Sequence, residues 1–234
     1  MVHLTTRSEA LSSLYLLLDE LAERCGGHRR LAVCHGRMGW PQRGIYFFFE
    51  DGELRDDGIT PRVVRVGTHA LRASNSTLWG RLRQHRGGHS GGGDHRGSVF
   101  RLHVGKALIN LGGWSEEISR TWGIGRTAPR EIRLVERPLE ESVSMRIGQM
   151  PFLWIGVDDE AGPASKRGLI ERAAISLLSN LSQPPIDSPS SAWLGRVAAN
   201  ESIRLSGLWN VNHVREASDA SFLRVLRTLI LATP

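Results

Sequence analysis

Three apolar runs along the chain have the character of β-strands. Residues 44–50 form an aromatic run that stops at the turn-forming pair Asp51-Gly52. Residues 62–67 form a second, β-branched run after a polar loop. Residues 151–157 are continuously apolar, which is typical of a strand buried on both faces. These runs predict a small sheet of three strands.

Helical spacing of apolar residues marks four further segments. Thr6 and Glu9 have the capping-box spacing at the start of the first segment. Ser76 and Ser165 are in position to cap the second and third, which follow the second and third strands. The predicted helices cover residues 6–25, 76–86, 166–180 and 219–230.

A long insertion separates the second and third strands. Residues 87–97 contain only glycine and polar side chains, so we expect a mobile loop there. Ser98 can cap a helix whose apolar face includes Phe100 and Val104. Residues 114–138 look irregular because glycine and proline interrupt them, and a short helix is predicted over 139–147.

The composition indicates what kind of molecule the protein binds. Of the residues, 40% are hydrophobic and 23% charged, as in an ordinary soluble protein. The net charge is +6 and the isoelectric point about 10.3, so the surface should attract polyanions. Only Lys106 and Lys166 are lysines among the 30 basic residues. The arginine excess suits phosphate recognition, and base-composition bias in the source genome explains it equally well.

The cysteine content and the hydropathy of the chain indicate in which cellular compartment the protein is expected. Cys25 and Cys34 are the only cysteines, and no secretory signal or membrane span is evident. Free thiols in a reducing compartment are therefore expected, and we expect the protein to be cytoplasmic.

A set of motifs follows the predicted elements in order. Gly44-Ile45-Tyr46 begins the first strand, and Arg65-Val66-Gly67 ends the second. Arg81 and His85 lie one turn apart on the helix that follows. This order resembles the GIY-YIG nuclease superfamily, whose second motif usually reads Tyr-Ile-Gly, so Arg65 replaces a tyrosine here.

The resemblance implies a fold and a domain organisation. The fold class is α/β (α+β), a small three-stranded mixed sheet flanked by helices. An N-terminal helix and basic connector occupy residues 1–40, and the nuclease core occupies 41–182 with the insertion at about 87–138. A helical extension, residues 183–234, is expected to pack on the core.

The resemblance also implies catalytic roles. Tyr46 would be the general base, although a phenol ordinarily ionises near pH 10 and so needs nearby cations. Arg81 would bind the scissile phosphate with its planar fork. His85 would bind or protonate a phosphate oxygen, or relay a proton to Tyr46. Glu171 is the only acidic residue inside the third-strand helix, so it is the expected ligand of one divalent cation, Mg²⁺ or Mn²⁺.

Other residues are expected to bind the substrate, most readily double-stranded DNA. Arg43 directly precedes the first strand and Arg65 lies within the second. Arg96 and Arg101 lie near the start of the helix capped by Ser98, where its N-terminus also favours phosphate. An asparagine often follows the metal-binding helix in the family, and Asn180 is the nearest candidate. A homodimer would allow cleavage of both strands.

Three alternatives stay open. Arg65 in the second motif is compatible with a non-catalytic nucleic-acid-binding protein that keeps the fold. A different metal-dependent nuclease could use Asp158 and Asp159, which follow the third strand. The histidines His89, His95 and His103, with Asp94, invite a second metal site, but their spacing matches no familiar zinc pattern.

Overall fold

The strand β2, Gly44–Leu54, lies at the centre of the molecule and is buried on both sides from Gly44 through Glu50. We describe the protein from a computed structural model, which covers residues 6–72, 74–88, 91–217 and 219–233. Ile45 and Phe47 pack into one hydrophobic core, and Tyr46 and Phe48 pack into a second core on the opposite face. The alternation follows from the two-residue period of a strand.

Within the described residues, four strands form the sheet, in the order β1-β4-β2-β3. They are β1 (Arg29–Arg30), β2, β3 (Pro61–Gly67) and β4 (Pro151–Gly156). The α+β class and the three long strands are confirmed. The sheet itself differs from the prediction, because β1 is an additional strand and every neighbouring pair is antiparallel rather than mixed. β3 and β4 do run in the same direction, but β2 lies between them.

This topology brings three strand ends to one edge of the sheet. Gly44 at the start of β2 pairs with Gly156 at the end of β4. Tyr46, two residues further on, pairs with Gly67 at the end of β3. The residues that follow β3 and β4 therefore emerge beside the Gly44-Ile45-Tyr46 segment.

The predicted end of the first strand at Asp51-Gly52 was wrong. Gly52 has a φ of +82°, and the register between β2 and β3 shifts in this region, but β2 continues through Leu54. The turn comes later, where the Arg55 amide donates to the Thr60 carbonyl at 2.8 Å. Asp57 completes it by accepting from the Ile59 and Thr60 amides. The glycine thus distorts the strand without ending it.

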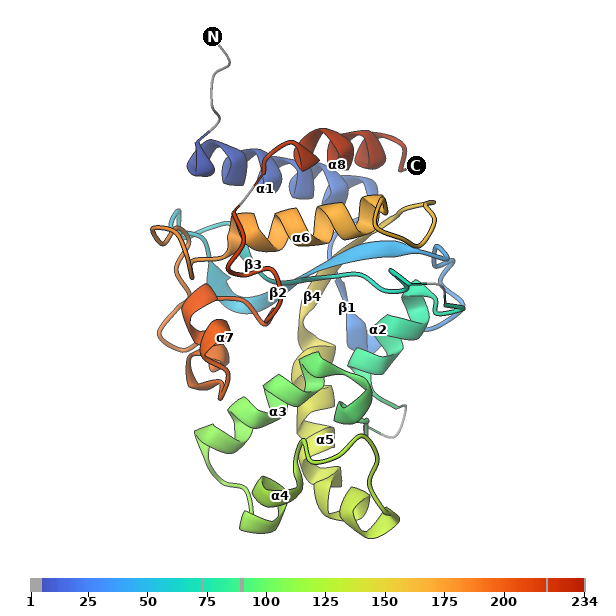
Figure 1. Ribbon diagram of the computed structural model, residues 1–234, viewed down its shortest axis with the longest axis vertical. Helices are drawn as coiled ribbons and strands as arrows, with labels where there is room; N and C mark the ends of the chain where they lie inside the picture. The colour runs from blue at the N-terminus through green and yellow to red at the C-terminus, as the bar shows by residue number, and fades with distance from the viewer. Residues whose placement is uncertain (1–5, 73, 89–90, 218, 234) are drawn as a thin grey trace.

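Three helices cover one face of the sheet. They are α1 (Arg7–Arg24), α6 (Lys166–Leu178) and α8 (Phe222–Leu231), with α1 and α8 side by side above α6 in Figure 1. The predicted capping box is confirmed, because Thr6 accepts from the Glu9 amide and Glu9 accepts from the Thr6 amide. Ser165 caps α6 by accepting from the Gly168 amide.

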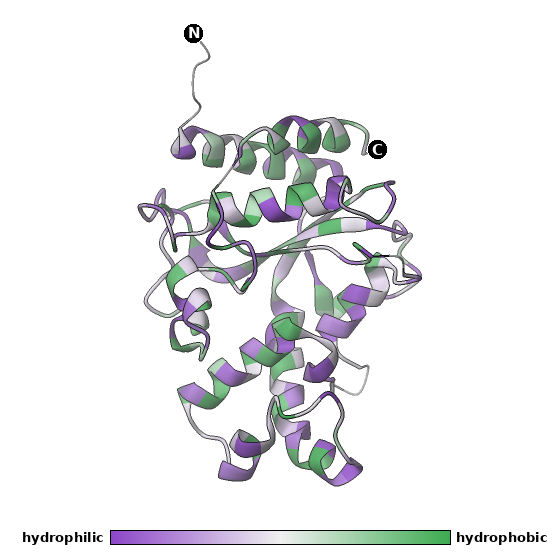
Figure 2. Ribbon diagram, viewed as in Figure 1, coloured by the Kyte–Doolittle hydropathy of each residue, from purple (hydrophilic) through white to green (hydrophobic). Residues whose placement is uncertain are grey.

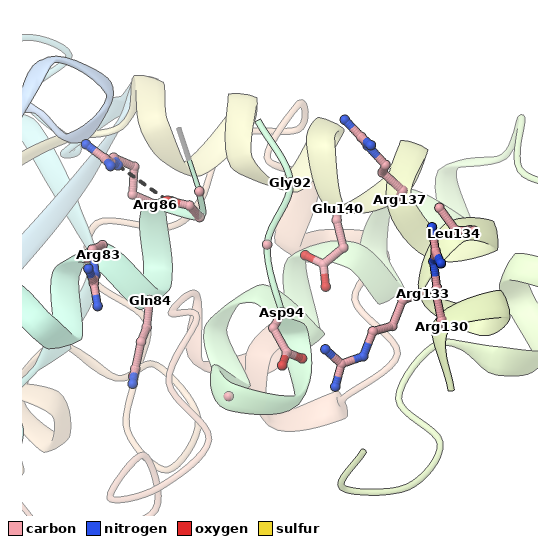
Figure 3. Close-up of a pocket in the computed structure, with 14 residues that line it drawn as sticks. Arg83, Gln84, Arg86, Gly92, Asp94, Arg130, Arg133, Leu134, Arg137 and Glu140 are labelled. Carbon is pink, nitrogen blue, oxygen red and sulfur yellow. Dashed lines mark hydrogen bonds between the residues drawn. The ribbon is translucent and has the colours of Figure 1, made fainter. Parts of the chain in front are cut away.

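The other face carries the helical insertion, which forms the lower part of the molecule in Figure 1. Its members and neighbours are α2 (Leu78–Arg86), α3 (Val99–Leu111), α4 (Glu116–Thr121), α5 (Arg130–Gln149) and α7 (Glu201–Ser206), with single turns of 3₁₀-helix at Leu31–Val33, His95–Gly97 and Leu194–Val197. Hydrophobic and hydrophilic residues alternate along these helices (Figure 2), and their buried hydrophobic residues form the second core together with residues of the sheet. A cleft between α2 and α5 is lined mainly by polar residues (Figure 3).

The prediction of irregular structure over residues 114–138 was wrong, since α4 and the first half of α5 occupy much of it. Pro138 lies inside α5 on its solvent side. Proline removes the hydrogen bond to the carbonyl four residues earlier, that of Leu134, and Leu134 is 56% exposed. The helix nevertheless continues through Pro138 to Gln149.

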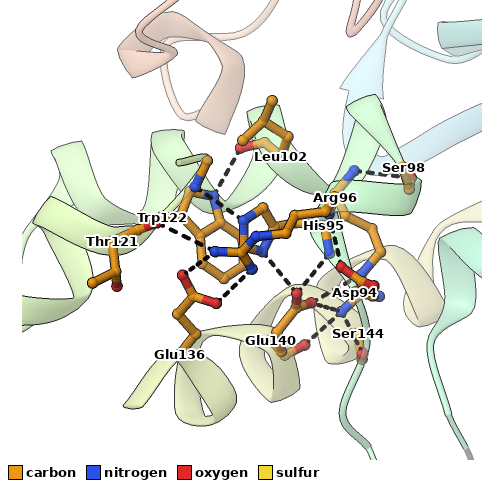
Figure 4. A network of polar contacts seen from close by, with 12 residues as sticks. Asp94, His95, Arg96, Ser98, Leu102, Thr121, Trp122, Glu136, Glu140 and Ser144 are labelled. Atoms are coloured by element: carbon orange, nitrogen blue, oxygen red, sulfur yellow. Dashed lines mark hydrogen bonds and ion pairs between the residues drawn. The ribbon is translucent and has the colours of Figure 1, made fainter. Parts of the chain in front are cut away.

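Buried charged residues tie the insertion together (Figure 4). Arg101 is fully buried, and its Nε donates to Glu140 Oε2 at 3.0 Å. His95 is joined to the other Glu140 oxygen at 2.9 Å and stacks on Trp122, with ring centroids 3.8 Å apart. Charged groups inside a protein are tolerated only with such partners, so this network fixes how α3 and α5 pack.

None of the described helices is long and apolar enough to cross a bilayer.

We expect Arg101→Met to lower the free energy of unfolding by about 3–5 kcal/mol, because it leaves the Glu140 carboxylate buried without its main cation. Arg137→Met is the matched control, since Arg137 and Glu141 form a similar pair on the same helix with side chains 55% and 41% exposed. The control should lose less than about 1 kcal/mol. Urea unfolding of both variants measures the difference, and equal losses would show that the buried network is not what holds the insertion together.

Candidate active site

Tyr46 reaches its neighbours across the sheet because its cross-strand partner is glycine. The phenol ring passes directly over Gly67, where a Cβ would overlap the phenol oxygen and ring. This contact explains why the second motif requires glycine at its last position: a side chain there would occupy the space of the Tyr46 ring. The first motif thus supplies the tyrosine ring of this packing contact, and the second motif supplies the glycine beneath it.

A hydrogen-bonded chain leads from Tyr46 into the insertion. Tyr46 Oη and His85 Nε2 lie 2.8 Å apart, and His85 Nδ1 lies 2.8 Å from Ser98 Oγ. His85 comes from α2, and Ser98 is the N-cap of α3, where it also accepts from the Arg101 amide. All three side chains are buried. The Tyr46 hydroxyl is therefore held in a single orientation.

The imidazole of His85 is kept neutral. Burial lowers the pKa of His85 well below its ordinary value, and the positive charges of Arg81, Arg65 and Arg101 lower it further. Both ring nitrogens are already engaged, and His85 is fully buried. The structure therefore places His85 behind Tyr46 as its hydrogen-bonding partner, a position that suits the predicted contact with Tyr46 better than the predicted contact with a phosphate.

Arg65 occupies the same face of the sheet as Tyr46. It is 8% exposed, its Nη1 donates to the Trp209 carbonyl at 3.1 Å, and its guanidinium lies 4.6 Å from the centre of the Phe100 ring. Its Nε is buried without a hydrogen-bond partner among the described residues. Burial lowers the pKa of Arg65, and the nearby Tyr46 partly offsets this effect. An arginine remains charged even so, which places a cation beside the phenol.

Glu171 and Arg81 line one cleft of about 420 Å³ at this edge of the sheet. Glu171 lies in the second turn of α6, and its Oε1 accepts from the Thr68 amide at 3.1 Å. Thr68 directly follows Gly67, so the carboxylate is attached to the backbone that supports the Tyr46 ring. Burial raises the pKa of Glu171, and Arg65 and the Thr68 amide oppose that rise.

Arg81 is positioned to bind an anion. It lies on α2 one turn before His85, and its Nη1 donates to Gln84 Oε1 at 3.1 Å and to the Gly97 carbonyl at 3.3 Å. Both acceptors are neutral, so no carboxylate among the described residues competes for the guanidinium. A phosphate in the cleft would make a stronger, charge-assisted bond.

The cleft suits a single hard cation. Glu171 is the only acidic residue among those that line it, and its Oε2 accepts no hydrogen bond from the described residues. No group of three or more His, Cys, Asp or Glu side chains that could hold a metal is found in the described ranges. Magnesium commonly binds through one or two carboxylates, with water and phosphate oxygens as its other ligands. One carboxylate facing an anion-binding arginine fits that pattern.

Tyr46, Arg81 and Glu171 come from three distant parts of the sequence and gather at one sheet edge. Tyr46 is fully buried and lies behind the residues that line the cleft, whereas Arg81 and Glu171 face into it. Arg43 borders the same edge, but its Nη1 donates to the Asp159 carbonyl.

Two predicted substrate-binding arginines are corrected by the structure. Arg96 forms a two-pronged pair with Glu136, at 2.6 and 2.8 Å, and its side chain is 5% exposed. Arg101 is paired with Glu140 and fully buried. Because each guanidinium is neutralised within the insertion, both stabilise the fold and neither is available to a nucleic acid.

Asn180 also lies away from the cleft. Its Oδ1 accepts from Arg7 and from the Ile186 amide, both at 3.0 Å. It follows Glu171 by nine positions, which corresponds to about 13 Å along a helix. Asn180 therefore anchors the chain after α6.

The other candidates have structural partners of their own. His95 is engaged by Glu140 and accepts from the Gly123 amide, so its ring nitrogens are not available to a metal. Burial, with Arg65 and Lys106, lowers the pKa of His103 to about 4. His89 lies outside the described residues. Asp159 accepts from Ser165 at 2.7 Å and pairs with Arg167 at the start of α6, which gives it a capping role.

Two residues of the site were not predicted from the sequence. His69 lines the cleft, is 7% exposed, and has an Nδ1 without a partner among the described residues. Ser98 is recognisable as a helix cap, but its second contact, with His85, depends on how α2 and α3 pack. Only the position of His69 two residues after the second motif could have drawn attention to it.

Comparison with known families shows to which family the chain belongs. The model of the GIY-YIG domain family matches residues 5–234, nearly the whole chain. The chain belongs to the GIY-YIG family, whose members are nucleases that act on nucleic acids and generally depend on a divalent metal ion. Neither the curated proteins nor the solved structures contain a match.

The contact between Tyr46 and Gly67 can be tested by Gly67→Ala. The added methyl group must displace the phenol, so we expect a loss of about 1–3 kcal/mol in the free energy of unfolding. Gly92→Ala is the control, because a Cβ at Gly92 would meet no atom within 4 Å. It should change stability by less than about 0.5 kcal/mol. A Gly67→Ala protein as stable as the control would show that the ring does not depend on this space.

Proposed function

We propose that this chain is a metal-dependent DNA endonuclease that hydrolyses phosphodiester bonds in the cleft between α2 and α6. The observation that supports this most is the meeting of Arg81 and Glu171 in one cleft, directly in front of the hydrogen-bonded pair Tyr46 and His85. Double-stranded DNA is the substrate we favour, since the chain carries a net charge of +6. We further propose that it acts in the cytoplasm, as a homodimer where both strands are cut.

Arg81 would hold the scissile phosphate. Its two present hydrogen bonds are to neutral oxygens, so it can exchange them for phosphate oxygens at little cost. A planar guanidinium placed there stabilises the additional negative charge of the pentacoordinate phosphorus. Arg43, at the same edge, could add to this positive field once it releases the Asp159 carbonyl.

Glu171 would hold the divalent cation, Mg²⁺ or Mn²⁺, through the oxygen that Thr68 does not engage. When bound, the cation supplies positive charge to the reacting phosphate and to the leaving oxygen. The raised pKa of Glu171 reflects its burial, and binding of a cation favours the ionised form.

Tyr46 would accept the proton of the attacking water. Arg65 would hold a positive charge beside the phenolate that accepts this proton, and neutral His85 would hold the phenol oxygen in place through their hydrogen bond. The hydroxyl lies deeper than the cleft walls, so the reaction requires a local opening when substrate binds. Movement of Arg81 from the Gly97 carbonyl to a phosphate would provide such an opening.

One observation favours a second function, that of a nucleic-acid-binding protein without cleavage activity. Tyr46 is fully buried, and the tyrosine usual in the second motif is replaced by Arg65. A protein that retained Arg81 and its basic surface but lost access to the base would bind DNA and leave it intact.

Cleavage of supercoiled plasmid with Mg²⁺ or Mn²⁺ distinguishes these functions. Tyr46→Phe and Arg81→Ala should each lower the cleavage rate by about 10²–10⁴-fold, because each removes a group that acts in the transition state. Glu171→Gln keeps the acceptor for Thr68 but loses the charge, so it should cleave poorly at any metal concentration. EDTA should abolish cleavage by the wild type.

Asp158→Ala is the control for this series, since Asp158 is exposed and follows β4. It should cleave like the wild type. Loss of activity in Asp158→Ala, with activity retained in Glu171→Gln, would show that the aspartates after β4 hold the metal ion and that Glu171 does not. A wild type that binds DNA and never cleaves it would establish the second function.

The role of Arg65 predicts a charge requirement at this position. Arg65→Met removes the cation beside Tyr46, and we expect it to lower the cleavage rate by about 10- to 100-fold, because a positive charge there stabilises the negative charge that develops during the reaction. Arg65→Lys, which keeps the charge, should retain a rate closer to that of the wild type. Equal cleavage rates for Arg65→Met and Arg65→Lys would show that the charge of Arg65 has no part in the reaction.

A further inference from the structure

A second and larger cleft lies beside the active site, between the C-terminal half of α2 and the N-terminal half of α5. Its volume is about 900 Å³. Figure 3 shows arginines of α2 on one side and arginines of α5 on the other. We refer to this cleft as the arginine groove; its basic residues are Arg83, Arg86, Arg130, Arg133 and Arg137.

The groove carries an excess of positive charge. Its acidic residues are Asp94 and Glu140. Glu140 is already paired with buried Arg101, and Asp94 Oδ1 accepts from the Arg96 amide at 3.0 Å. Five arginines and two carboxylates leave an excess of three positive charges on the lining residues. Arg101, which does not line the groove, also neutralises one of these carboxylates, that of Glu140.

The spacing of the α5 arginines matches a linear polyanion. Arg130, Arg133 and Arg137 are three and four residues apart, so they lie along one side of the helix. They span about 10 Å of helix. One strand of duplex DNA carries a phosphate about every 3.4 Å along its axis, so about three phosphates fall within that length.

Several of these arginines are available for binding. Arg83 and Arg130 are exposed, and their guanidinium groups make no hydrogen bond or ion pair with the described residues. Within the same described ranges, Arg133 donates to the Ala128 carbonyl alone, and Arg137 to the exposed Glu141 alone. The N-cap of α5, Pro129, makes no side-chain cap, which leaves the first amides of the helix free of a side-chain acceptor.

The groove continues from the active-site cleft. Gln84 on α2 lines both, with Arg81 on the side of the active site and Arg83 on the side of the groove. A strand whose phosphate was bound by Arg81 would therefore pass over α2 and enter the groove.

We propose that the arginine groove binds the sugar–phosphate backbone of the DNA substrate on one side of the scissile phosphate. This inference rests on the proposed function, which it extends by assigning the helical insertion to backbone binding. Contacts of this kind go to phosphate oxygens, so the groove adds affinity and register without reading base sequence.

The test compares two pairs of substitutions that remove equal charge. Arg83→Ala with Arg130→Ala removes one arginine from each side of the groove. Arg224→Ala with Arg227→Ala removes two exposed arginines from α8, which lies across the sheet from the groove (Figure 1). Binding to a labelled DNA duplex is measured in EDTA, so that cleavage does not interfere, at several salt concentrations between about 50 and 200 mM.

We expect the groove variant to reduce the slope of log affinity against log salt by about 2, one for each phosphate that the variant no longer neutralises. Its affinity at about 0.1 M salt should fall by roughly tenfold to a hundredfold. The α8 variant should keep a slope close to the wild type. Equal slopes for the two variants, or a groove variant that binds like the wild type, would overturn the proposal.

A separate plasmid assay with Mg²⁺ keeps the two proposals apart. A wild type that does not cleave plasmid, with a groove variant that loses the expected slope, contradicts the nuclease proposal and supports the groove. A wild type that cleaves plasmid while the groove variant binds as tightly as the wild type contradicts the groove alone.

Discussion

The position of β2 between two antiparallel neighbours is the constraint on which the site depends. Because β3 and β4 both run opposite to β2, both end where β2 begins. The segments that follow them, leading into α2 and α6, must therefore start at the same edge as the Gly44-Ile45-Tyr46 segment. The phenol, the guanidinium of Arg81 and the carboxylate of Glu171 meet there as a consequence of topology. Burial of β2 on both faces then fixes which way each side chain points.

Pairing with carboxylates divides the many arginines into two classes. Some are buried and matched by an acidic residue, as in the pairs Arg62–Glu53, Arg96–Glu136, Arg101–Glu140 and Arg167–Asp159. Others, such as Arg81, Arg83 and Arg130, face the two clefts and have no carboxylate partner among the described residues. A buried pair is costly to break and contributes little field outside the protein. The attraction for a polyanion therefore comes from the second class, and the net charge alone does not reveal where that class lies.

Sequence reasoning succeeded for several local signals, although Thr77 and not Ser76 caps α2. The capping box at Thr6 and Glu9, the cap at Ser165 and the order of strands and helices each depend on residues a few positions apart. It failed where the partner was distant. Whether Arg96 or Arg101 faces DNA depends on Glu136 and Glu140, about 40 residues further along the chain. The glycines and prolines of residues 114–138 misled in another way, since α5 continues through Pro138 although proline removes one hydrogen bond of the helix.

The helical insertion links the two halves of the proposed function. Ser98 and Arg101, both at the start of α3, hold His85 through its ring nitrogen and its backbone carbonyl, and His85 in turn holds Tyr46. Arg101 is anchored on Glu140 of α5, the helix that carries one side of the arginine groove. Helix α5, which would bind the DNA backbone, is thus connected through the buried pair of Glu140 and Arg101 to His85, whose side chain is hydrogen-bonded to Tyr46. A displacement of α5 on DNA binding would therefore move the contacts that hold Tyr46, and this is a physical route by which occupation of the arginine groove could alter the access of water to the Tyr46 hydroxyl.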